Sequence, residues 1–439
     1  THPSSVAFRR CSVDYRRTPG LSKTHPSRHR RRPPPPNSFV TQESARAEFD
    51  PVIDTALGQA ASDVRYAHPT PSLCLASFAR LASAPSQPDP SWFHRMPSSV
   101  AGRLLYVIKS GLLQPTSWMG CYASHVDDYS LLASLFDDVL GSMNTGSPVV
   151  TKPSMSSNSY DLRSQGLTKS VSIRARVSRN FEGWPLPSRM SETERLLLEQ
   201  RLIRLLCNAS ATRPCPVFSL TPHDRWAKAS TQVASKNPWH VGGDALRQLR
   251  ESHVMFQDTS NDVYLTSAGV SSNWPSGRGC IVLSTGIIAW YGEEDHLRLI
   301  VVDDKGHQLG ETYNKLIRSL EAVAAVLSSD GMHFARHPRY GFVSSCPSNL
   351  GLGLRISVLL PLHSCRGVSQ SAQLQDWQQK AAAQGLSLRG FAGEGSEIRT
   401  DDPVEVTNSK SNRPFQTAEQ MLSGLLSGAS TLFRDQCEA

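Results

Sequence analysis

A cysteine, two glycines and an arginine lie within ten residues in the segment CPSNLGLGLR, from Cys346 to Arg355. The backbone amides at the glycines and the guanidinium of Arg355 suit an anion, and the thiol could stand beside a charged acceptor. A buried thiol, a turn and a solvent-facing arginine would explain the same residues. Two other segments favour the chemical interpretation: WYGEEDHLR, from Trp290 to Arg298, and the arginines at positions 174, 176 and 179.

The positive charge of the chain is concentrated at its start. The 439 residues carry a formal charge of +8, but residues 1–42 hold nine of the 46 basic residues and one of the 38 acidic ones. The remaining residues are therefore electrically balanced, so composition indicates no nucleic-acid partner. No apolar run approaches the roughly 18 residues of a membrane span, and we expect no membrane association.

Residues 1–42 are rich in Arg, Ser and Pro, a composition typical of disorder. This basic tail fits an organelle transit peptide, a nuclear-localisation patch or translated upstream sequence. Nine cysteines without a CxxC pair, in a chain too long to need disulfides, favour a reducing compartment and argue against structural zinc. We expect a cytoplasmic location, with organelle targeting as the alternative.

The rest of the chain divides into a helical part and a mixed part. Apolar residues recur at helical spacing over 100–108 and 129–140, which predicts a small helical domain over residues 43–147. A polar linker over 148–166 follows, and residues 167–439 form a second, larger domain. The fold class that this pattern predicts is α+β.

Strand signals in the larger domain predict a largely antiparallel sheet. Two apolar runs, 280–283 and 287–290, are joined by a short turn and predict a hairpin, and alternating patterns predict strands over 297–302 and 354–362. Helices flank the sheet, and two of them follow capping boxes at Ser191 with Glu194 and at Thr417 with Gln420.

Four segments in one order resemble the phosphagen (guanidino) kinases, the family of arginine kinase and creatine kinase. The family pattern CPSNLGTGLR differs here only at Leu352, and NEEDHLR differs only at Gly292. RGFAGEG, from Arg389, is similar to the RG-x-x-G element, and SGLLQPTSWMGCYA, from Ser110, is similar to the substrate-specificity loop. The resemblance spans roughly residues 96–435. It implies a glutamine-synthetase-like catalytic domain that reversibly transfers the γ-phosphoryl group of ATP to a guanidine.

The donor end of such a reaction needs fixed positive charge, because the phosphoryl group in flight spreads negative charge over its oxygens. The resemblance implies that ATP or ADP is bound by Arg174, Arg176, Arg298, Arg355, Arg389 and His253. Residues two apart on a strand share a face, so Arg174 and Arg176 can converge. Alternating apolar residues around Arg298 favour a strand over a helical pair with Glu294.

The acceptor end needs anions that hold a guanidinium in line. The resemblance implies catalytic roles for Glu294, Cys346 and Glu394, and we expect neighbouring arginines to favour the Cys346 thiolate. Ser117, Gly120 and Tyr122 match the loop that contacts the substrate, and the length of that loop together with Glu394 favours L-arginine. Trp118 and Met119 replace smaller residues, so taurocyamine or another guanidine stays open.

Several departures from the family pattern raise the alternative of a degenerate, non-catalytic nucleotide-binding paralogue. Leu352 stands between glycines that approach the phosphates, Leu359 replaces a histidine near the adenine, and the loop 391–403 is altered. Kinase activity on protein arginines is disfavoured by the helical domain. We expect Mg²⁺ to be held by phosphates and water, with no protein metal site, and the protein to be a monomer or a homodimer.

Overall fold

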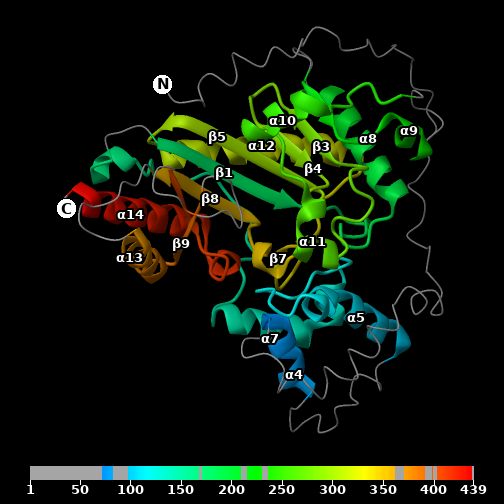
Figure 1. The fold of residues 1–439 in the computed structure, drawn as a ribbon, viewed down its shortest axis with the longest axis horizontal. Helices are drawn as coiled ribbons and strands as arrows, with labels where there is room; N and C mark the ends of the chain where they lie inside the picture. Colours follow the sequence, from blue (N-terminus) through cyan, green and yellow to red (C-terminus); the bar gives the residue numbers. More distant parts are fainter. Residues whose placement is uncertain are drawn as a thin grey trace.

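The computed structural model describes residues 72–82, 97–167, 171–208, 215–229, 236–360, 370–390, 398 and 403–437. The expected basic tail, residues 1–42, lies outside this part of the chain. Figure 1 shows a large sheet domain above a smaller group of helices. Within the described residues, no helix is both long and apolar enough to cross a membrane.

An eight-stranded sheet with antiparallel pairing between all neighbouring strands forms the centre of the larger domain (Figure 1). In spatial order the strands are β2 (Val217–Ser219), β3 (Gly279–Val282), β4 (Ile288–Tyr291), β5 (Leu297–Gly306), β1 (Val171–Arg179), β8 (Leu354–Leu360), β10 (Val404–Asn408) and β9 (Leu386–Arg389). The antiparallel α+β fold expected from the sequence is confirmed.

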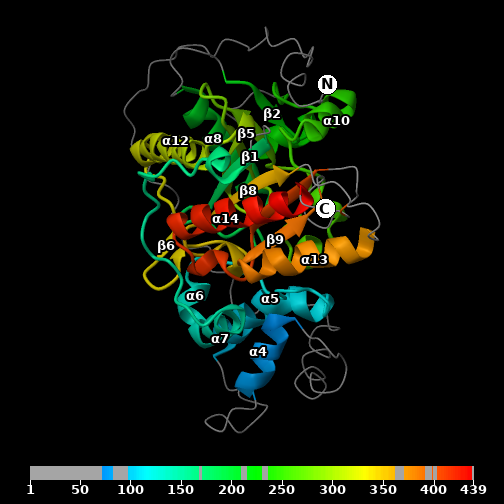
Figure 2. The same ribbon diagram turned by 90° about the vertical axis from the view of Figure 1, so that its left-hand side faces the viewer.

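One face of this sheet is covered by long helices, with α13 and α14 lying beside β9 and β8 in Figure 2. These helices are α8 (Glu192–Asn208), α12 (Leu309–Ser329), α13 (Gln370–Ala383) and α14 (Ala418–Cys437). The covered face buries Ile173, Ala175 and Val177 of β1, whereas the alternate residues of that strand point to the other face. Alternation on β1 therefore separates the core from Arg174 and Arg176, whereas Arg179 shares the parity of the core residues and is buried.

The other face of the sheet is divided into two halves. Over β2 to β5 it carries apolar side chains that pack against α10 (Gly243–Glu251) and the segment after it, including Met255 and Phe256. Over β1, β8, β10 and β9 the same face carries charged side chains instead. The boundary between these halves runs along β5 and β1.

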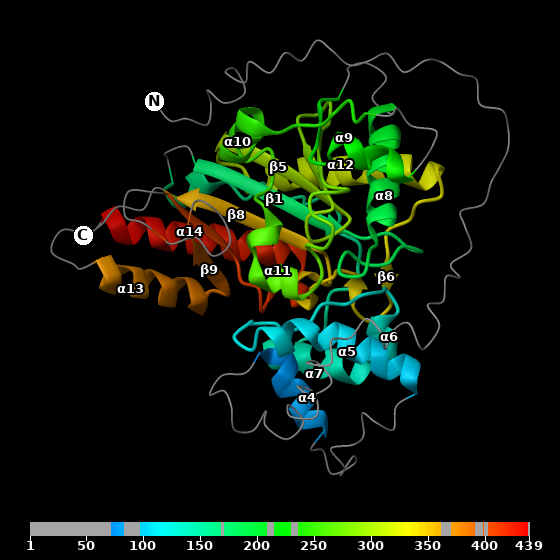
Figure 3. The ribbon, with the colours of Figure 1, turned by 45° about the vertical axis from the view of Figure 1, so that its right-hand side comes forward.

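The smaller domain consists of α4 (Leu73–Ala82), α5 (Ser98–Leu113), α6 (Asp128–Leu131) and α7 (Ala133–Met143), grouped below the sheet in Figure 3. Its apolar core also contains residues of the larger domain, among them Leu186, Val343 and Cys346. The helical group therefore packs directly on the segment that carries Cys346.

Short elements connect these layers. They are α9 (His223–Trp226), α11 (Val263–Ser267), the two-stranded sheet of β6 (Arg336–His337) and β7 (Gly341–Phe342), and the 3-10 helices η2 (Leu162–Gln165), η3 (Ala227–Ala229), η4 (Thr259–Asn261), η5 (Pro347–Asn349) and η6 (Arg413–Phe415). In Figures 1 and 3, α11 and the β6–β7 sheet lie at the junction between the two domains.

Local sequence signals correctly predicted the starts of two helices. Ser191 and Glu194 exchange capping hydrogen bonds before α8, and Thr417 and Gln420 do so before α14. The β3–β4 hairpin is confirmed. Two expectations differ from the structure. β5 does not stop at residue 302 but continues to Gly306, because its last residues still pair with β1. The helical pattern over 129–140 belongs to two helices, α6 and α7, because the backbone leaves helical geometry at Leu132, with a φ of −114° and a ψ of 34°.

Candidate active site

Five arginines lie on the charged half of the sheet face. Arg174 and Arg176 alternate with core residues on β1, and Arg176 stands directly opposite Arg355 of β8. Arg298 of β5 is opposite Ser178 of β1, and Arg389 of β9 is opposite Glu405 of β10. Residues opposite each other in an antiparallel ladder share a face, so four strands bring these arginines to one surface. The structure thus gathers the five arginines that were expected to bind phosphate, whereas Arg179, singled out with Arg174 and Arg176, is buried on the opposite face of β1.

Arg298 is held by carboxylates from its own segment. Its guanidinium donates to Glu293 and Glu294 and lies 3.2 Å from the nearer oxygen of Asp295. Burial opposes its charge, but the three carboxylates outweigh burial and raise the pKa of Arg298 well above its usual value. Arg298 therefore contacts Glu294 although the segment is not helical: Arg298 lies on β5, and Glu294 lies in the loop before that strand.

Arg355 is also paired. Its Nη2 donates to Glu405 Oε2 at 2.6 Å, and its Nε donates to Thr407 Oγ1 at 3.0 Å. Both partners come from β10, the neighbouring strand. Arg174 differs, because its Nε is buried and no acceptor within the described residues takes a hydrogen bond from it. A buried donor in this condition is suited to an anion that arrives with a ligand.

Glu405 is a site residue that the sequence reasoning missed. It lies opposite Leu359 of β8 and Arg389 of β9, inside the arginine cluster. Burial alone would raise its pKa, but the charge of Arg355, with a bond from Ser357 and the charges of Arg174 and Arg389, lowers it to about 2. The alternation of VEVTN around it was the available signal, because that pattern predicts a strand with Glu405 opposite in direction to Val404 and Val406.

His253 lies near the same surface, in the segment that follows α10. Burial first, and then the charge of Arg174, lower the pKa of His253 to about 4. Trp290 of β4 holds this segment in place, because its indole nitrogen donates to the carbonyl of Val254 at 2.7 Å. The segment that carries His253 therefore borders the arginine surface.

Glu294 and Cys346 come together from two separate segments. Burial first, and then the charge of Glu294, raise the pKa of Cys346 to about 12, although a contact with Ser348 at 3.1 Å acts in the opposite direction. The expectation that neighbouring arginines favour the Cys346 thiolate is therefore wrong for the protein without substrate. A guanidinium beside the two groups would reverse the effect, since an opposite charge favours the thiolate.

A buried network aligns the segments of Glu294 and Cys346. Asp295 accepts hydrogen bonds from Asn180 at 2.7 Å, from the Ser344 hydroxyl at 2.9 Å and from the Ser345 amide at 3.2 Å. The Ser345 hydroxyl then donates to the carbonyl of Glu294 at 3.1 Å. Neither Asn180 nor these serines were identified from the sequence, because their partners lie 49 or more residues away.

The segment 110–123 packs against this network. The amide of Ala123 donates to the carbonyl of Ser345 at 2.8 Å, and that of Tyr122 donates to Val107 at 3.0 Å. Ser117 accepts a hydrogen bond from the Gly120 amide, so its hydroxyl braces the turn. Gly120 has a φ of 72°, and a Cβ there would lie 2.1 Å from Ser72 Oγ. The loop expected to contact substrate is thus tied to the backbone before Cys346.

Two departures from the family pattern take different positions. Leu352, which stands between two glycines, has its side chain buried in the core of the larger domain. Its carbonyl accepts from Arg179 at 2.9 Å. Leu359 does lie on the charged face, opposite Ser172 and Glu405. Glu394 lies outside the described residues, as does most of the loop 391–403.

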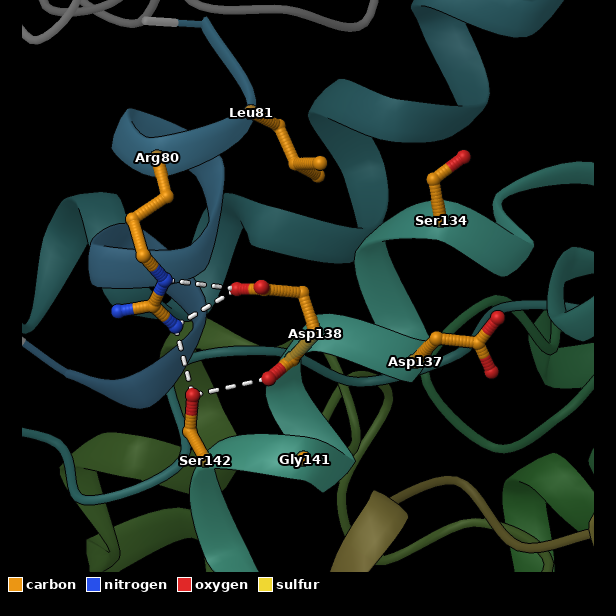
Figure 4. A pocket seen from close by; sticks show the side chains of 7 residues that line it. All are labelled: Arg80, Leu81, Ser134, Asp137, Asp138, Gly141 and Ser142. Atoms are coloured by element: carbon orange, nitrogen blue, oxygen red, sulfur yellow. Dashed lines mark hydrogen bonds and ion pairs between the residues drawn. The ribbon is translucent and has the colours of Figure 1, made fainter. Parts of the chain in front are cut away.

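A hollow of about 500 Å³ lies elsewhere, on the helical domain (Figure 4). It is lined by Arg80, Leu81, Ser134, Asp137, Asp138, Gly141 and Ser142. Arg80 faces Asp138 and Ser142 there, with its Nη2 2.6 Å from an oxygen of each. None of the candidate site residues lines this hollow.

Comparisons with known proteins agree with this geometry. Residues 228–432 match the family model of the ATP:guanido phosphotransferase C-terminal catalytic domain. A probable arginine kinase of Caenorhabditis elegans is 30% identical over 335 residues, covering 73% of this chain and 83% of the relative. An arginine kinase of Amphioctopus fangsiao is 27% identical, covering 76% of this chain and 88% of the relative.

Solved structures share the fold. A lombricine kinase aligns with a TM-score of 0.60 and 21% identity, covering 79% of this chain and 91% of its own. A duplicated taurocyamine kinase from Schistosoma mansoni aligns with a TM-score of 0.66 and 22% identity, covering 87% of this chain and 48% of its own. The fold, the arginine surface and the relatives together establish that this chain belongs to the phosphagen kinases, the ATP:guanido phosphotransferase family.

Proposed function

We propose that this protein transfers the γ-phosphoryl group of ATP to the guanidino group of L-arginine, reversibly. The observation that carries the proposal is the gathering of five arginines on one sheet face, at the end of which Glu294 and Cys346 meet. Family membership gives guanidino phosphotransfer as the class of activity. The choice of arginine rests on the curated relatives and on the loop 110–123.

Catalysis would consist of positioning and charge compensation. Arg174, Arg176, Arg298, Arg355 and Arg389 form the proposed phosphate clamp. Planar guanidinium forks bind phosphate oxygens in pairs and keep their charge at any physiological pH. They would hold the triphosphate still and neutralise the charge that spreads over the transferred group.

The acceptor guanidinium would lie between Glu294 and Cys346, and Glu394 is proposed as a second carboxylate. Glu294 would orient the planar group and accept a proton from the attacking nitrogen, and Cys346 would contribute electrostatically rather than by covalent attack. Ser117, Gly120 and Tyr122 would shape the site for the amino-acid end of the substrate. Holding both substrates in line can supply several kcal/mol of barrier reduction.

Magnesium would enter with the nucleotide. Within the described residues, no group of His, Cys, Asp and Glu is arranged to hold a metal ion. The nearby carboxylates Glu293, Glu294 and Asp295 all contact Arg298, whose charge repels a cation. Phosphate oxygens and water are therefore the proposed ligands of Mg²⁺, which would neutralise phosphate charge when bound.

A coupled assay with MgATP and a panel of guanidines tests the proposal. The panel contains L-arginine, taurocyamine, lombricine and creatine, and the variant Glu311→Gln, on the exposed surface of α12, controls for preparation effects. We expect the highest kcat/KM with L-arginine. A preference for another guanidine would change the substrate but keep the reaction, whereas no turnover with any of them would contradict the proposed function.

A non-catalytic nucleotide-binding protein is the second candidate. The pairing of Arg298 and Arg355 with carboxylates favours it, because these two arginines already have anionic partners. Binding of MgADP without turnover on the guanidine panel would establish this alternative. Turnover would exclude it.

A further inference from the structure

The carboxylate of Glu405 lies where the proposed phosphate clamp would receive an anion. It is 2.6 Å from Arg355 Nη2, it faces Arg389 across the β10–β9 ladder, and the charge of Arg174 also acts on it. The side chain of Glu405 is 12% exposed and that of Arg355 is 7% exposed. Three of the five clamp arginines, from three strands, therefore act on one buried carboxylate of the same chain.

The chemistry of this carboxylate matches that of a phosphate group. Both present negatively charged oxygens to guanidinium N–H groups, and both are bound best by arginine. Another partner of Arg355, the hydroxyl of Thr407, is neutral and contributes no second negative charge. A nucleotide phosphate that binds Arg355 must therefore compete with the carboxylate of Glu405, which is already paired with this arginine.

We propose that Glu405 is a built-in competitor of the nucleotide phosphates for Arg355, and that it sets the nucleotide affinity of the enzyme. This inference rests on the proposed function, because it takes the five arginines to be the phosphate clamp. The apparent dissociation constant of a ligand equals its intrinsic constant divided by the fraction of protein whose site is open to it. Glu405 would weaken binding of the nucleotide in this way, and so help product release.

A role for Glu405 as a ligand of Mg²⁺ does not fit its surroundings. Arg355, Arg389 and Arg174 are the charged groups nearest to it, and all three repel a cation. A purely structural ion pair is the remaining alternative. The two roles predict opposite changes in nucleotide affinity when the charge is removed.

The test is the full-length variant Glu405→Gln, which keeps the shape of the side chain but not its charge. We expect its dissociation constants for MgADP and MgATP, measured by titration calorimetry, to fall at least about tenfold below wild type. Asp138→Asn is the matched control, because Asp138 pairs with Arg80 at the same distance, 2.6 Å, in the hollow of Figure 4. The control should bind nucleotide as wild type does.

Thermal melting distinguishes competition from a structural role. Without ligand, Glu405→Gln should melt below wild type, because three arginines lose a counter-ion. With saturating MgADP, its melting temperature should rise more than that of wild type. The variant Glu405→Asp, whose shorter carboxylate withdraws from Arg355, should show smaller changes of the same sign and gives a second measurement if the glutamine variant does not fold.

Each outcome decides between the two proposals. Nucleotide binding by wild type with equal or weaker binding by Glu405→Gln would overturn the inference about Glu405 and leave the proposed function standing. No nucleotide binding by wild type or by the variant would overturn both. Tighter binding by Glu405→Gln together with unchanged binding by Asp138→Asn would support both.

Discussion

The proposed phosphate clamp and the proposed acceptor site are held in place by different kinds of structure. The clamp arginines stand on β5, β1, β8 and β9, whose backbones are fixed by continuous antiparallel ladders. Glu294 and Cys346 stand in loops, which are joined by side chains such as Asp295 and by single backbone hydrogen bonds. The phosphate end is thus set by one sheet, and the acceptor end by contacts between two domains.

This difference suggests how one fold can serve several guanidines. A sheet fixes the arginines to one another, so the binding of phosphates depends little on the helical domain. The acceptor end includes the loop 110–123, whose Ala123 is tied to Ser345 by one hydrogen bond. Changes in that loop can therefore alter the acceptor without disturbing the phosphate end.

The largest effect is expected at the acceptor end, from Glu294→Gln. Loss of the carboxylate should lower kcat by roughly 10³-fold, since orientation and proton acceptance are lost together. The affinity for MgADP should not weaken, because Glu294 competes for Arg298. Steady-state kinetics and calorimetry measure these quantities, with Glu311→Gln as the control. A kcat within tenfold of wild type would show that Glu294 does not contact the acceptor.

A smaller effect is expected at the phosphate end, from Arg176→Lys. The charge remains but the planar fork is lost, so kcat/KM for ATP should fall roughly 100-fold. The KM for the guanidine should stay near wild type, because the acceptor loops are untouched. Arg80→Lys, in the helical domain, is the control. An equal loss of affinity for both substrates would mean that the two ends are not independent.

The smallest effect on turnover is expected from Gly120→Ala in the acceptor loop. The new Cβ would lie 2.6 Å from Ser72 Cβ, and a φ of 72° adds strain of about 1–2 kcal/mol. We expect a severalfold rise in the guanidine KM and unchanged ATP kinetics. Gly286→Ala is the matched control, with a φ of 78° and no atom within 4 Å of its Cβ. If both variants lost only stability, the loop would not shape the acceptor site.

The strands of the clamp were predictable because alternation is a local pattern. Leu297, Leu299 and Val301 alternate with Arg298 and identified its strand, and the same rule placed Arg355 on the open face. The burial of Leu352 was not predicted, because the glycines on either side of it indicate a turn but not the direction of its side chain. The burial of Cys346 was one of two alternatives left open by the sequence, since it depends on packing against the helical domain.

The family resemblance, the antiparallel sheet and the identity of the arginines could be predicted from the sequence, because they follow from motifs and from a period of two along each strand. The contacts between charged groups could not be predicted, because they depend on strand pairing and packing. Glu405 and Arg355 are 50 residues apart, and strand pairing brings them into contact. Glu294 lies beside Cys346 because Asp295, Asn180 and Ser345 form a buried network. Charges interact strongly where water is excluded, so the protonation state of each buried group depends on partners that are distant in the sequence.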